Sequence, residues 1–599
     1  MGESRKSHDD EQFLAAGVEI RPAAGGKSWA FNERTGSVEL LDDSLAGLIQ
    51  YLDRWRSLQG HVAAVAEAGV GGQAAGMIED GIAELSRRGL LISRTQFLDA
   101  LRSDNPLAVS RAIDVVSWCT KDRPAELARS MESFLDSATR RGHEPQVLVC
   151  DDSQDPAVQE KNRATVAKEG RQRGLTTRYL GLKEKRELAG ELLSRNDDIP
   201  PEILEFALFG LPGSSDTTGA NHNALLLATR GQVVFNTDDD TLCEFTRSPG
   251  AGAQGFELSS APDPTVSLFY LDAASLAEGV AFEDLDILSA QAALLGGITS
   301  DRFPAALRID SMTAQFVRRL MNRTCKVAAV ACGVCGDCGL WDPRYLLRLT
   351  AGSRDRLIQS EATYHAASSN RLLLRAVPHA TVSSSTYFQA MCVTLDNSLL
   401  LPPFFPVGRS CDGIFAQTMR TLLPDLFIAH VPLAVRHEPP ALRQFEPGSI
   451  RRMTFRFAEL INLVLADCAA HVSHASAVDA LEDASRFLEE VASLPSGDYL
   501  AYVRSRYLAH LSRYIADLET LLAVHKASPK FWAEDVESLL ETLVKLPTRR
   551  DFCIPSDLKE GRNDEEVLTL ARQLTDRFGG LLSAWPEMIE AAAHIQRTP

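Results

Sequence analysis

The sequence predicts an α/β protein with three parts: a small N-terminal domain, a central domain built on a parallel sheet, and a helical C-terminal region. Three apolar segments, at 113–120, 145–150 and 232–237, alternate with helical segments, which is typical of parallel strands buried on both faces. From about residue 448 onward, the apolar residues recur at helical spacing instead.

Residues 13–95 are predicted to form the N-terminal domain. The short strands "GVEIRP", "SWAF" and "SVELLD" are separated by turn residues and are followed by helices. The last helix places Ile78, Ile82 and Leu85 on one face and ends at Gly89. A β-hairpin followed by helices, at this size, predicts a winged-helix domain.

The central domain is predicted to cover residues 110–440, and polar residues follow three of its strands. These are Thr120–Arg123, Asp151–Ser153 and Asp238–Asp240. Ligands of open α/β sheets bind at the carboxyl ends of the strands, so we expect a ligand site there. The helices of residues 448–599 are expected to buttress this domain or to form a homodimer.

Composition excludes several classes of function. The formal net charge of −18 at pH 7 argues against binding a nucleic acid backbone as the main activity. No apolar run reaches the roughly 20 residues of a membrane span, and the polar N-terminus lacks the apolar core of a secretory signal. Eleven scattered cysteines fit free thiols in a reducing compartment. We therefore expect a cytoplasmic protein.

The acidic triplet at 238–240 predicts a cation site. Asp238 and Asp240 point to one side of an extended strand, and Asp239 points to the other. Like charges this close repel each other, and Mg²⁺ or Mn²⁺ resolves the repulsion by binding carboxylates together with phosphate and water. The alternative is a solvated acidic turn that caps the next helix.

The segments "VVSWCTKDRP", "VLVCDDS" and "GANHNALLLATRGQVVFNTDDDTL", with the later "PPFFPVGRSCDGIFAQ", resemble the GT-A fold glycosyltransferases, most closely the inverting family 2. The resemblance implies a Rossmann-like domain that binds a nucleotide sugar, with Mn²⁺ or Mg²⁺ as cofactor. It assigns Asp238 and Asp240 to the metal, and a late histidine, His437, completes the metal shell in this reading.

The same resemblance assigns residues to the nucleotide sugar. The ends of the first two strands would hold the base and ribose through Thr120, Arg123, Asp151 and Asp152. The family places an Arg-Asn pair on the helix before the acidic triplet, and this chain has His222 and Asn223 there. Asp239, inside the triplet, is also assigned to the nucleotide sugar.

Transfer with inversion needs a base that deprotonates the acceptor. In the resembling family the base lies in an acidic motif after the acceptor loop, where "VGRSCDGIF" makes Asp412 the candidate. The alternative is that Asp412 caps a helix. If the enzyme retains configuration instead, Asp412 has another role.

The segment "CGVCGDCG" contains Cys332, Cys335 and Cys338. Zinc sites usually have four ligands in two separated pairs, and no fourth ligand is evident here. The glycines predict a turn that exposes Asp337 and shapes an acceptor pocket. We therefore favour structural or acceptor-loop thiols over a zinc site.

Residues 13–95 also resemble the PqqD-like recognition element of peptide-modifying enzymes, on "GVEIRP", "SVELLDDSLAGLIQYLD" and "GMIEDGIAELSRRGLL". The resemblance implies capture of a leader peptide by strand addition. The strand that pairs with the peptide would be 37–41, which carries Val38 and Leu40. The wall of the peptide groove would be the helix 77–88, which carries Ile78, Ile82 and Leu85. The alternatives are a packing module and, disfavoured by the acidic last helix, a DNA-binding module.

The sequence thus predicts a glycosyltransferase that moves a sugar from a nucleotide sugar to a Ser, Thr or Cys side chain of a ribosomally made precursor peptide. The expected donor is a UDP-sugar. One alternative is a transferase whose acceptor is a polysaccharide, a protein or a small molecule. Another is a peptide-binding scaffold without catalytic activity.

Overall fold

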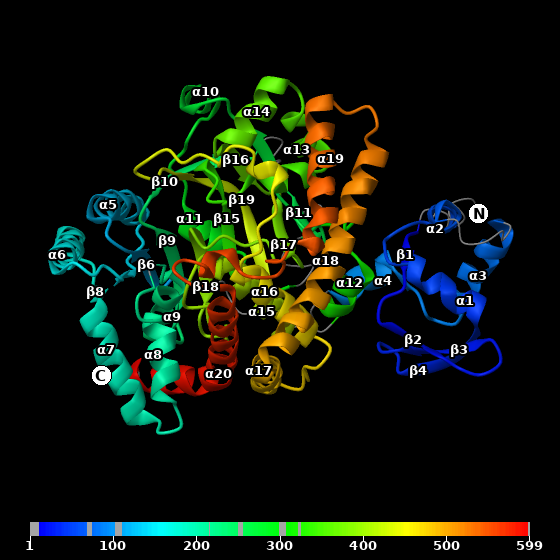
Figure 1. Cartoon of the computed structure of the whole chain (residues 1–599), viewed down its shortest axis with the longest axis horizontal. Coiled ribbons are helices and arrows are strands. Elements are labelled where there is room, and N and C mark those ends of the chain that lie inside the picture. Colours follow the sequence, from blue (N-terminus) through cyan, green and yellow to red (C-terminus); the bar gives the residue numbers. More distant parts are fainter. Residues whose placement is uncertain are drawn as a thin grey trace.

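The protein is described from a computed structural model. It describes residues 11–68, 75–101, 111–214, 216–248, 255–298, 307–321 and 325–596. The predicted domain boundary at residue 110 lies outside these ranges. Figure 1 shows a small N-terminal unit beside a larger body in which a central sheet is enclosed by helices. The architecture is mixed α/β, as the sequence predicts.

The N-terminal unit has a three-stranded antiparallel sheet and its own apolar core. The sheet order is β2 (Val18–Pro22), β3 (Lys27–Asn32), β4 (Ser37–Asp42), and the short β1 (Phe13–Leu14) pairs with β5 (Ile92–Ser93). The helices are α1 (Asp43–Leu48), α2 (Leu58–Glu67), α3 (Ala75–Arg87) and α4 (Arg94–Ala100). Ala30 and Leu41 from the sheet share one core with Ile78, Ile82 and Leu85 of α3.

The first half of the large sheet contains the three strands predicted from apolar segments. Its order is β8 (Thr177–Leu180), β7 (Gln146–Asp151), β6 (Val115–Thr120), β9 (Val233–Asp238), and all neighbours are parallel. The intervening helices are α5 (Pro124–Arg140), α6 (Pro156–Arg173), α7 (Leu182–Arg195), α8 (Pro201–Phe209) and α9 (Thr218–Ala228). This is the parallel, doubly covered arrangement that the sequence predicts.

Alternate residues of these strands enter different cores, which explains their near-continuous apolar sequence. In β6, Val115 and Cys119 pack in one core with α7, α8 and α9, whereas Val116 and Trp118 pack in another with α5. The parallel register brings the polar strand ends together: Thr120 lies opposite Asp151, and Cys119 lies opposite Asp238.

The second half of the sheet is mixed rather than parallel. From β9 it continues through β18 (Cys392–Asp396), β15 (Lys326–Asp337), β19 (Leu426–His437), β17 (Ala380–Ser383), β11 (Phe256–Ser259) and β14 (Leu307–Arg308). Four strands pair beside this path, namely β10 (Thr241–Arg247), β12 (Val266–Phe269), β13 (Gly296–Gly297) and β16 (Leu372–Ala376). The helices are α10 (Ala273–Gly279), α11 (Ile287–Ala292), α12 (Ala314–Leu320), α13 (Ala351–Leu357), α14 (Glu361–Ser369) and α15 (Cys411–Leu422), with the 3-10 helix η3 (Pro343–Arg348).

The cysteine-rich segment is not the predicted turn, because it forms the last part of the central strand β15. Its glycines allow neighbouring strands to approach closely: a Cβ on Gly336, whose φ is +115°, would lie 2.2 Å from the carbonyl oxygen of His437. Asp337 is buried rather than exposed, and it forms ion pairs with Arg371 and Arg443 at 3.0 Å each.

The C-terminal region is helical, as predicted from its periodicity. It contains α16 (Phe457–Cys468), α17 (Ala477–Ser493), α18 (Ser496–Val524), α19 (Lys530–Lys545) and α20 (Asp564–Gln596). These helices share the core of α7, α8 and α9, and Trp585 donates a hydrogen bond to the carbonyl of Leu401. The region therefore buttresses the face of the sheet that carries α9. Among the described residues, no helix combines the length and apolar character that crossing a bilayer requires.

Candidate active site

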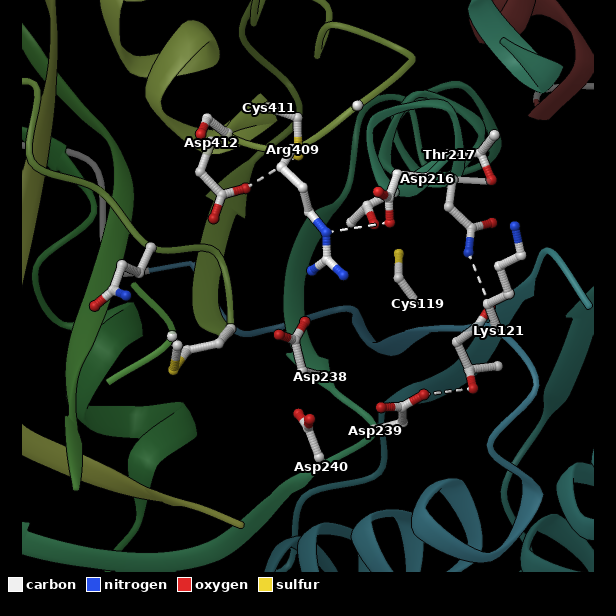
Figure 2. Close-up of a pocket in the computed structure, with 18 of the residues that line it drawn as sticks. Cys119, Lys121, Asp216, Thr217, Asp238, Asp239, Asp240, Arg409, Cys411 and Asp412 are labelled. Carbon is white, nitrogen blue, oxygen red and sulfur yellow. Dashed lines mark hydrogen bonds and ion pairs between the residues drawn. The ribbon is translucent and has the colours of Figure 1, made fainter. Parts of the chain in front are cut away.

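A cavity of about 460 Å³ opens at the carboxyl ends of β6, β7 and β9. The end of β19 and the start of α15 form its other walls. Figure 2 shows the carboxylates of Asp238, Asp239, Asp240 and Asp412 around this space, with the side chain of Arg409 extending between them. Eight of the residues singled out from the sequence line it, namely Thr120, Arg123, Asp152, Asp238, Asp239, Asp240, Asp412 and His437.

Two residues with strained backbones flank the cavity. Asp122 has φ of 58° and Ser410 has φ of 71°, values in the left-handed region that few residues other than glycine adopt. Asp122 lies in the loop after β6, where its N–H donates a 2.8 Å hydrogen bond to Ser153 Oγ. Ser410 precedes α15. Strained residues of this kind concentrate at functional sites.

Arg123 supplies part of the counter-charge for the acidic triplet. Its Nη1 donates to Asp239 Oδ1 at 3.0 Å and to Asp240 Oδ2 at 2.9 Å. Thr120 Oγ1 donates to Asp239 Oδ2 at 2.7 Å. Burial, reinforced by the charge of Asp240, still raises the pKa of Asp239 to about 6. Thus the protein itself neutralises part of a charge that the sequence assigns to a cation alone.

His437 supplies further counter-charge for Asp240. Its Nε2 lies 3.2 Å from Asp240 Oδ1, and its Nδ1 donates a 2.6 Å hydrogen bond to the carbonyl oxygen of Asp337. Although burial alone would raise the pKa of Asp240, the hydrogen bond and charge of His437, followed by Arg123, hold this pKa well below its usual value. Burial opposes the charged form of His437, but Asp240 raises the pKa of the imidazole.

Asp238 differs from its two neighbours. Its carboxylate has no hydrogen bond or ion pair with the residues that the structure describes, although it lines the cavity. Burial first, and then the charges of Asp240 and Asp239, raise its pKa to about 8. A carboxylate in this position is poised to accept a cation.

The donor set fits a divalent metal held jointly with a phosphate group. Within the described ranges, no group of three or more His, Cys, Asp and Glu is arranged to hold a metal by itself. Mg²⁺-type ions commonly take one or two carboxylates and complete their shell with substrate phosphates and water. Asp238 and Asp240 provide those carboxylates. The Nδ1–H bond of His437 to a backbone carbonyl is the arrangement that orients histidine ligands, which leaves Nε2 facing Asp240.

Asp152 lines the cavity, but both of its oxygens are engaged. One pairs with the ammonium group of Lys185, and the other accepts a 2.7 Å hydrogen bond from Thr217 Oγ1. Lys185 is fully buried, and it also donates to Asn221 Oδ1 at 2.7 Å. Sequence reasoning missed Lys185 because the segment "LKEKRELAGELLSR" has the composition of a solvated helix.

Asp151, His222 and Asn223, which the sequence assigns to the nucleotide sugar, do not line the cavity. Asp151 is completely buried, where it accepts hydrogen bonds from Ser153 N, Asn162 Nδ2 and Tyr179 Oη. The residue that supports the loops here is therefore Asp151, and the residue that faces the ligand space is Asp152.

The predicted pair on α9 must also be corrected. His222 stacks on Phe404, with 4.6 Å between the ring centroids, and Asn223 bonds to the backbone of Phe404 and Ala207. Neither lines the cavity. Asn221, one residue earlier, lines it instead and donates to the carbonyls of Thr120 and Cys150. The sequence identified the right helix but the wrong face of it.

Asp412 lies in the first turn of α15, across the cavity from the acidic triplet (Figure 2). Its Oδ2 accepts a 3.0 Å hydrogen bond from the N–H of Ala390. It is not the capping residue of α15, a position that Ser410 occupies without a side-chain hydrogen bond. The alternative role as a helix cap is therefore wrong.

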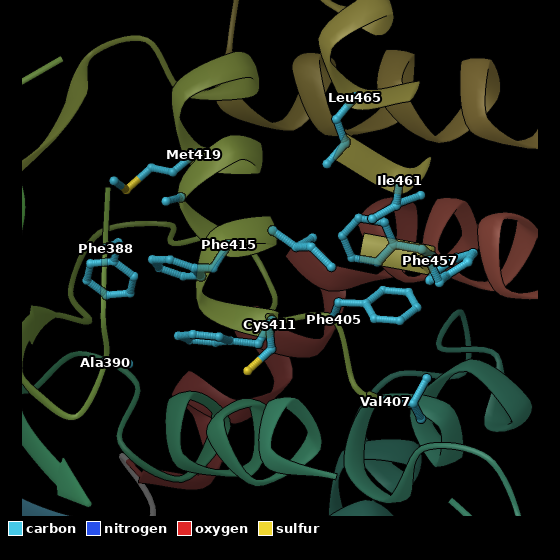
Figure 3. Close-up of a cluster of buried hydrophobic side chains, with 14 of the residues drawn as sticks. Phe388, Ala390, Phe405, Val407, Cys411, Phe415, Met419, Phe457, Ile461 and Leu465 are labelled. Atoms are coloured by element: carbon cyan, nitrogen blue, oxygen red, sulfur yellow. The ribbon is translucent and has the colours of Figure 1, made fainter. Parts of the chain in front are cut away.

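The apolar side of α15 fixes the position of Asp412. Phe415 stacks on Phe404 with 4.2 Å between the ring centroids, and it lies 5.6 Å from the ring of Phe388. Figure 3 shows this cluster continuing through Phe405 to Phe457 of α16. The helix therefore carries Asp412 on a rigid base.

The comparisons with known proteins do not assign this chain to a family. No family model and no curated protein sequence matches the chain. Among solved structures, a mannosyltransferase from Pyrobaculum calidifontis, in complex with GDP-mannose and Mn²⁺, aligns over 75% of this chain and 92% of its own. The identity is 13% and the TM-score is 0.25. A likeness this weak shows no shared fold, and the candidate site stands on its own geometry.

Sequence reasoning also missed an ion pair at the mouth of the cavity. Arg409 Nε lies 3.1 Å from Asp216 Oδ1, and Trp341, about half exposed, stands beside them with its ring 5.4 Å from the Arg409 guanidinium. No sequence signal distinguishes these residues from ordinary loop residues, because segments far apart in the chain bring them together.

The cysteine cluster lies apart from any metal chemistry that the described residues support. Cys332, Cys335 and Cys338 are buried free thiols. Cys332 and Cys338 pack in one core, whereas Cys335 packs in a different one. Cys332 and Cys335 act as small apolar residues of the central strand β15, and Cys338 follows directly after it. Gly339, the last residue of the segment, lines the cavity, so a role of this segment in an acceptor loop stays a prediction.

The predicted peptide-binding residues of the N-terminal unit fall into two groups. Val38 and Leu40 are exposed on the outer face of the sheet, where they pair across strands with Phe31 and Trp29, also exposed. The residues assigned to the groove wall lie instead in the core of the unit and do not face solvent, namely Ile78, Ile82 and Leu85. The part of the prediction that uses α3 side chains as contacts must therefore be corrected.

Proposed function

We propose that the chain is a metal-dependent glycosyltransferase that uses a nucleotide-sugar donor. The observation that carries this proposal is the unpaired carboxylate of Asp238 at the carboxyl edge of parallel strands, beside Asp240 and across the cavity from Asp412. A parallel sheet edge of this kind is where nucleotides bind. A cavity of about 460 Å³ also has the size of a small-molecule site.

Asp238 and Asp240 would hold Mn²⁺ or Mg²⁺, with His437 oriented beside them. When bound, the ion neutralises the charge that develops on the departing diphosphate. Arg123 and Arg443 line the same cavity and add fixed positive charge next to that leaving group. Arg443 is held by its ion pair with Asp337, so it does not need to reorganise during the reaction.

Asp412 is the proposed base. As the acceptor oxygen or sulfur bonds to the anomeric carbon, the bond from that carbon to the diphosphate oxygen breaks, and the acceptor proton passes to the Asp412 carboxylate. This attack from the face opposite the leaving group inverts the anomeric configuration. The backbone N–H of Ala390 and the packed helix α15 hold the carboxylate in place.

The acceptor that fits the N-terminal unit is a precursor peptide with a leader. Exposed Trp29, Phe31, Val38 and Leu40 make an apolar face on a small sheet, and β4 is an edge strand of that sheet. An extended peptide can add to such an edge and cover such a face. Tethering the leader would raise the local concentration of the core peptide at the cavity.

Donor hydrolysis tests the catalytic proposal without a known acceptor. A panel of UDP- and GDP-sugars would be incubated with the full chain, with Mn²⁺ or with EDTA, and release of nucleoside diphosphate measured. We expect Mn²⁺-dependent hydrolysis of one donor, reduced at least a hundredfold in Asp238→Asn and unchanged in the matched surface variant Asp197→Asn. Equal rates in the wild type and Asp238→Asn would reject the proposal.

Stability provides a second readout that needs no turnover. Folding either places the Asp238 charge in a partly buried site or protonates it against a pKa raised to about 8. Both cost free energy that Asp238→Asn avoids, so we expect this variant to melt at a higher temperature than the wild type in EDTA. We also expect Mn²⁺ with a nucleoside diphosphate to raise the melting temperature of the wild type only. Peptide capture without any donor hydrolysis would instead favour a non-catalytic scaffold.

A further inference from the structure

A second large cavity lies away from the acidic triplet, between the N-terminal unit and the helices of the body. Its volume is about 1000 Å³. Of the residues that the structure describes, five arginines line this basic cavity. They come from α12, η3, the end of α15 and α18, namely Arg318, Arg319, Arg348, Arg420 and Arg513. Figure 1 shows α12 and α18 next to each other on the side of the body that faces the N-terminal unit.

The acidic residues of the basic cavity do not balance its arginines. Among the described residues, three carboxylates line it, those of Glu33, Asp425 and Asp517. Glu33 is paired with Arg318 at 2.6 Å, and Asp517 with Arg348 at 3.3 Å. Five arginines against three carboxylates leave an excess of two positive charges, in a chain whose formal net charge is −18.

Two arginines carry this excess. Arg420 has no hydrogen bond or ion pair with any of the residues described, and Arg513 donates only to the carbonyl of Ala509, at 3.3 Å. Neither has a carboxylate partner within the described ranges. Guanidinium groups without partners are suited to bind oxyanions, because each presents a planar fork of donors.

The neighbouring groups show that positive charge is crowded here. Burial, and next the charge of Arg420, lower the pKa of Arg319 to about 10. The guanidinium of Arg319 is fixed by two hydrogen bonds to the carbonyl of Pro424, at 3.1 and 2.9 Å. Burial, with Arg513 and Arg348, likewise lowers the pKa of His510. An anion would relieve this repulsion.

We propose that the basic cavity binds a multiply charged phosphate anion, either an inorganic oligophosphate or the phosphate chain of a nucleotide. Arg420 and Arg513 are its main contacts, and Arg319 holds a fixed charge beside them. This site is separate from the candidate active site, with which it shares no lining residue. Its position next to the Arg318–Glu33 ion pair means that the ligand would lie where the N-terminal unit meets the body.

Isothermal titration of the full chain with sodium tripolyphosphate tests the proposal. We expect binding at low salt that weakens as ionic strength rises. Arg420→Gln and Arg513→Gln should each lower the affinity roughly tenfold or more, because each removes a charge-assisted contact. The matched control is Arg171→Gln, at an exposed arginine of α6 that lines neither cavity, and it should leave the affinity unchanged.

Arg123→Gln separates this site from the active site, which also contains cations. Loss of tripolyphosphate binding in Arg123→Gln, with no change in the Arg420→Gln and Arg513→Gln variants, would overturn the proposal. Melting temperatures of each variant without ligand exclude loss of binding through unfolding. Titration with ATP then distinguishes an inorganic oligophosphate from a nucleotide. An affinity for ATP equal to that for tripolyphosphate indicates that phosphate alone is recognised, and tighter binding of ATP indicates a nucleotide site. Absence of donor hydrolysis would not affect either result.

Discussion

His437 Nε2 lies 3.2 Å from Asp240 Oδ1, although the two residues are almost 200 positions apart in the chain. The strands bring them together: Thr241, at the start of β10, lies opposite His437 at the end of β19. On its other side β19 pairs with β15, where Gly336 lies opposite His437. The imidazole is therefore placed by strand register, and its Nδ1 bond to Asp337 sets its orientation.

Gly336→Ala is expected to disturb this placement. Gly336 has φ of +115°, and an added Cβ would lie 2.2 Å from the carbonyl oxygen of His437. We expect a loss of roughly 2–4 kcal/mol in the free energy of unfolding, from backbone strain and the clash together. Urea unfolding measures this loss.

The matched control for Gly336→Ala is Gly190→Ala. Gly190 lies inside α7, and an added Cβ would meet no atom within 4 Å. This substitution should raise the stability by about 0.5–1 kcal/mol, because alanine favours a helix over glycine. Equal effects at both positions would contradict the close approach of β15 and β19.

Lys185→Met is expected to be severely destabilising. The ammonium group is fully buried and pairs with Asp152, so its removal leaves a carboxylate uncompensated. Breaking a buried pair in this way costs about 3–5 kcal/mol. The double variant Lys185→Met/Asp152→Asn removes both charges and should recover much of that loss in a double-mutant cycle. A double variant no more stable than Lys185→Met would show that the pair is not the cause.

The strands that build the site were predictable from the sequence because their residues are apolar on both faces. Once β6, β7 and β9 are recognised as parallel neighbours, their polar ends must meet at one edge, which is why Thr120, Asp152 and Asp238 were correctly brought together. This inference needs only local pattern and one rule of topology.

Other features depend on packing that no local pattern contains. The rotation of α9 decides that Asn221, and not His222, faces the cavity. The burial of Lys185 depends on a tertiary partner 33 residues away. Glycines in the segment 332–338 suggest a turn, yet here they permit the close approach of strands. In each case the residue types can be read from the sequence, whereas the packing around them cannot.

His430 is expected to make the protein less stable in mild acid. Burial first, opposed in part by Asp263, lowers its pKa to about 4, and its Nε2 has no hydrogen-bond partner among the described residues. Because the folded pKa lies below the unfolded value of about 6.5, the unfolded chain binds the proton first. Stability is thus unaffected above pH 6.5 and falls by up to about 3 kcal/mol between pH 6.5 and 4.

His430→Phe should remove this part of the pH dependence. The difference in the free energy of unfolding between the variant and the wild type should grow in favour of the variant as the pH falls from 7.5 to 5. Urea unfolding at both pH values measures it, with the exposed His365→Gln as control. A difference that stays constant with pH would mean that His430 has the same pKa in the folded and unfolded states, which would contradict the prediction.

The apolar face of the N-terminal sheet gives the sharpest test of the peptide acceptor. Val38 and Leu40 are 58% and 38% exposed, so the double variant Val38→Asp/Leu40→Asp should change the melting temperature little. If a leader covers this face, the variant should bind a labelled candidate leader peptide at least tenfold more weakly, by fluorescence anisotropy. Leu442→Asp, at a position 74% exposed elsewhere on the surface, should bind like the wild type. Unchanged affinity in the double variant would separate the N-terminal unit from peptide capture and direct the search to other acceptors.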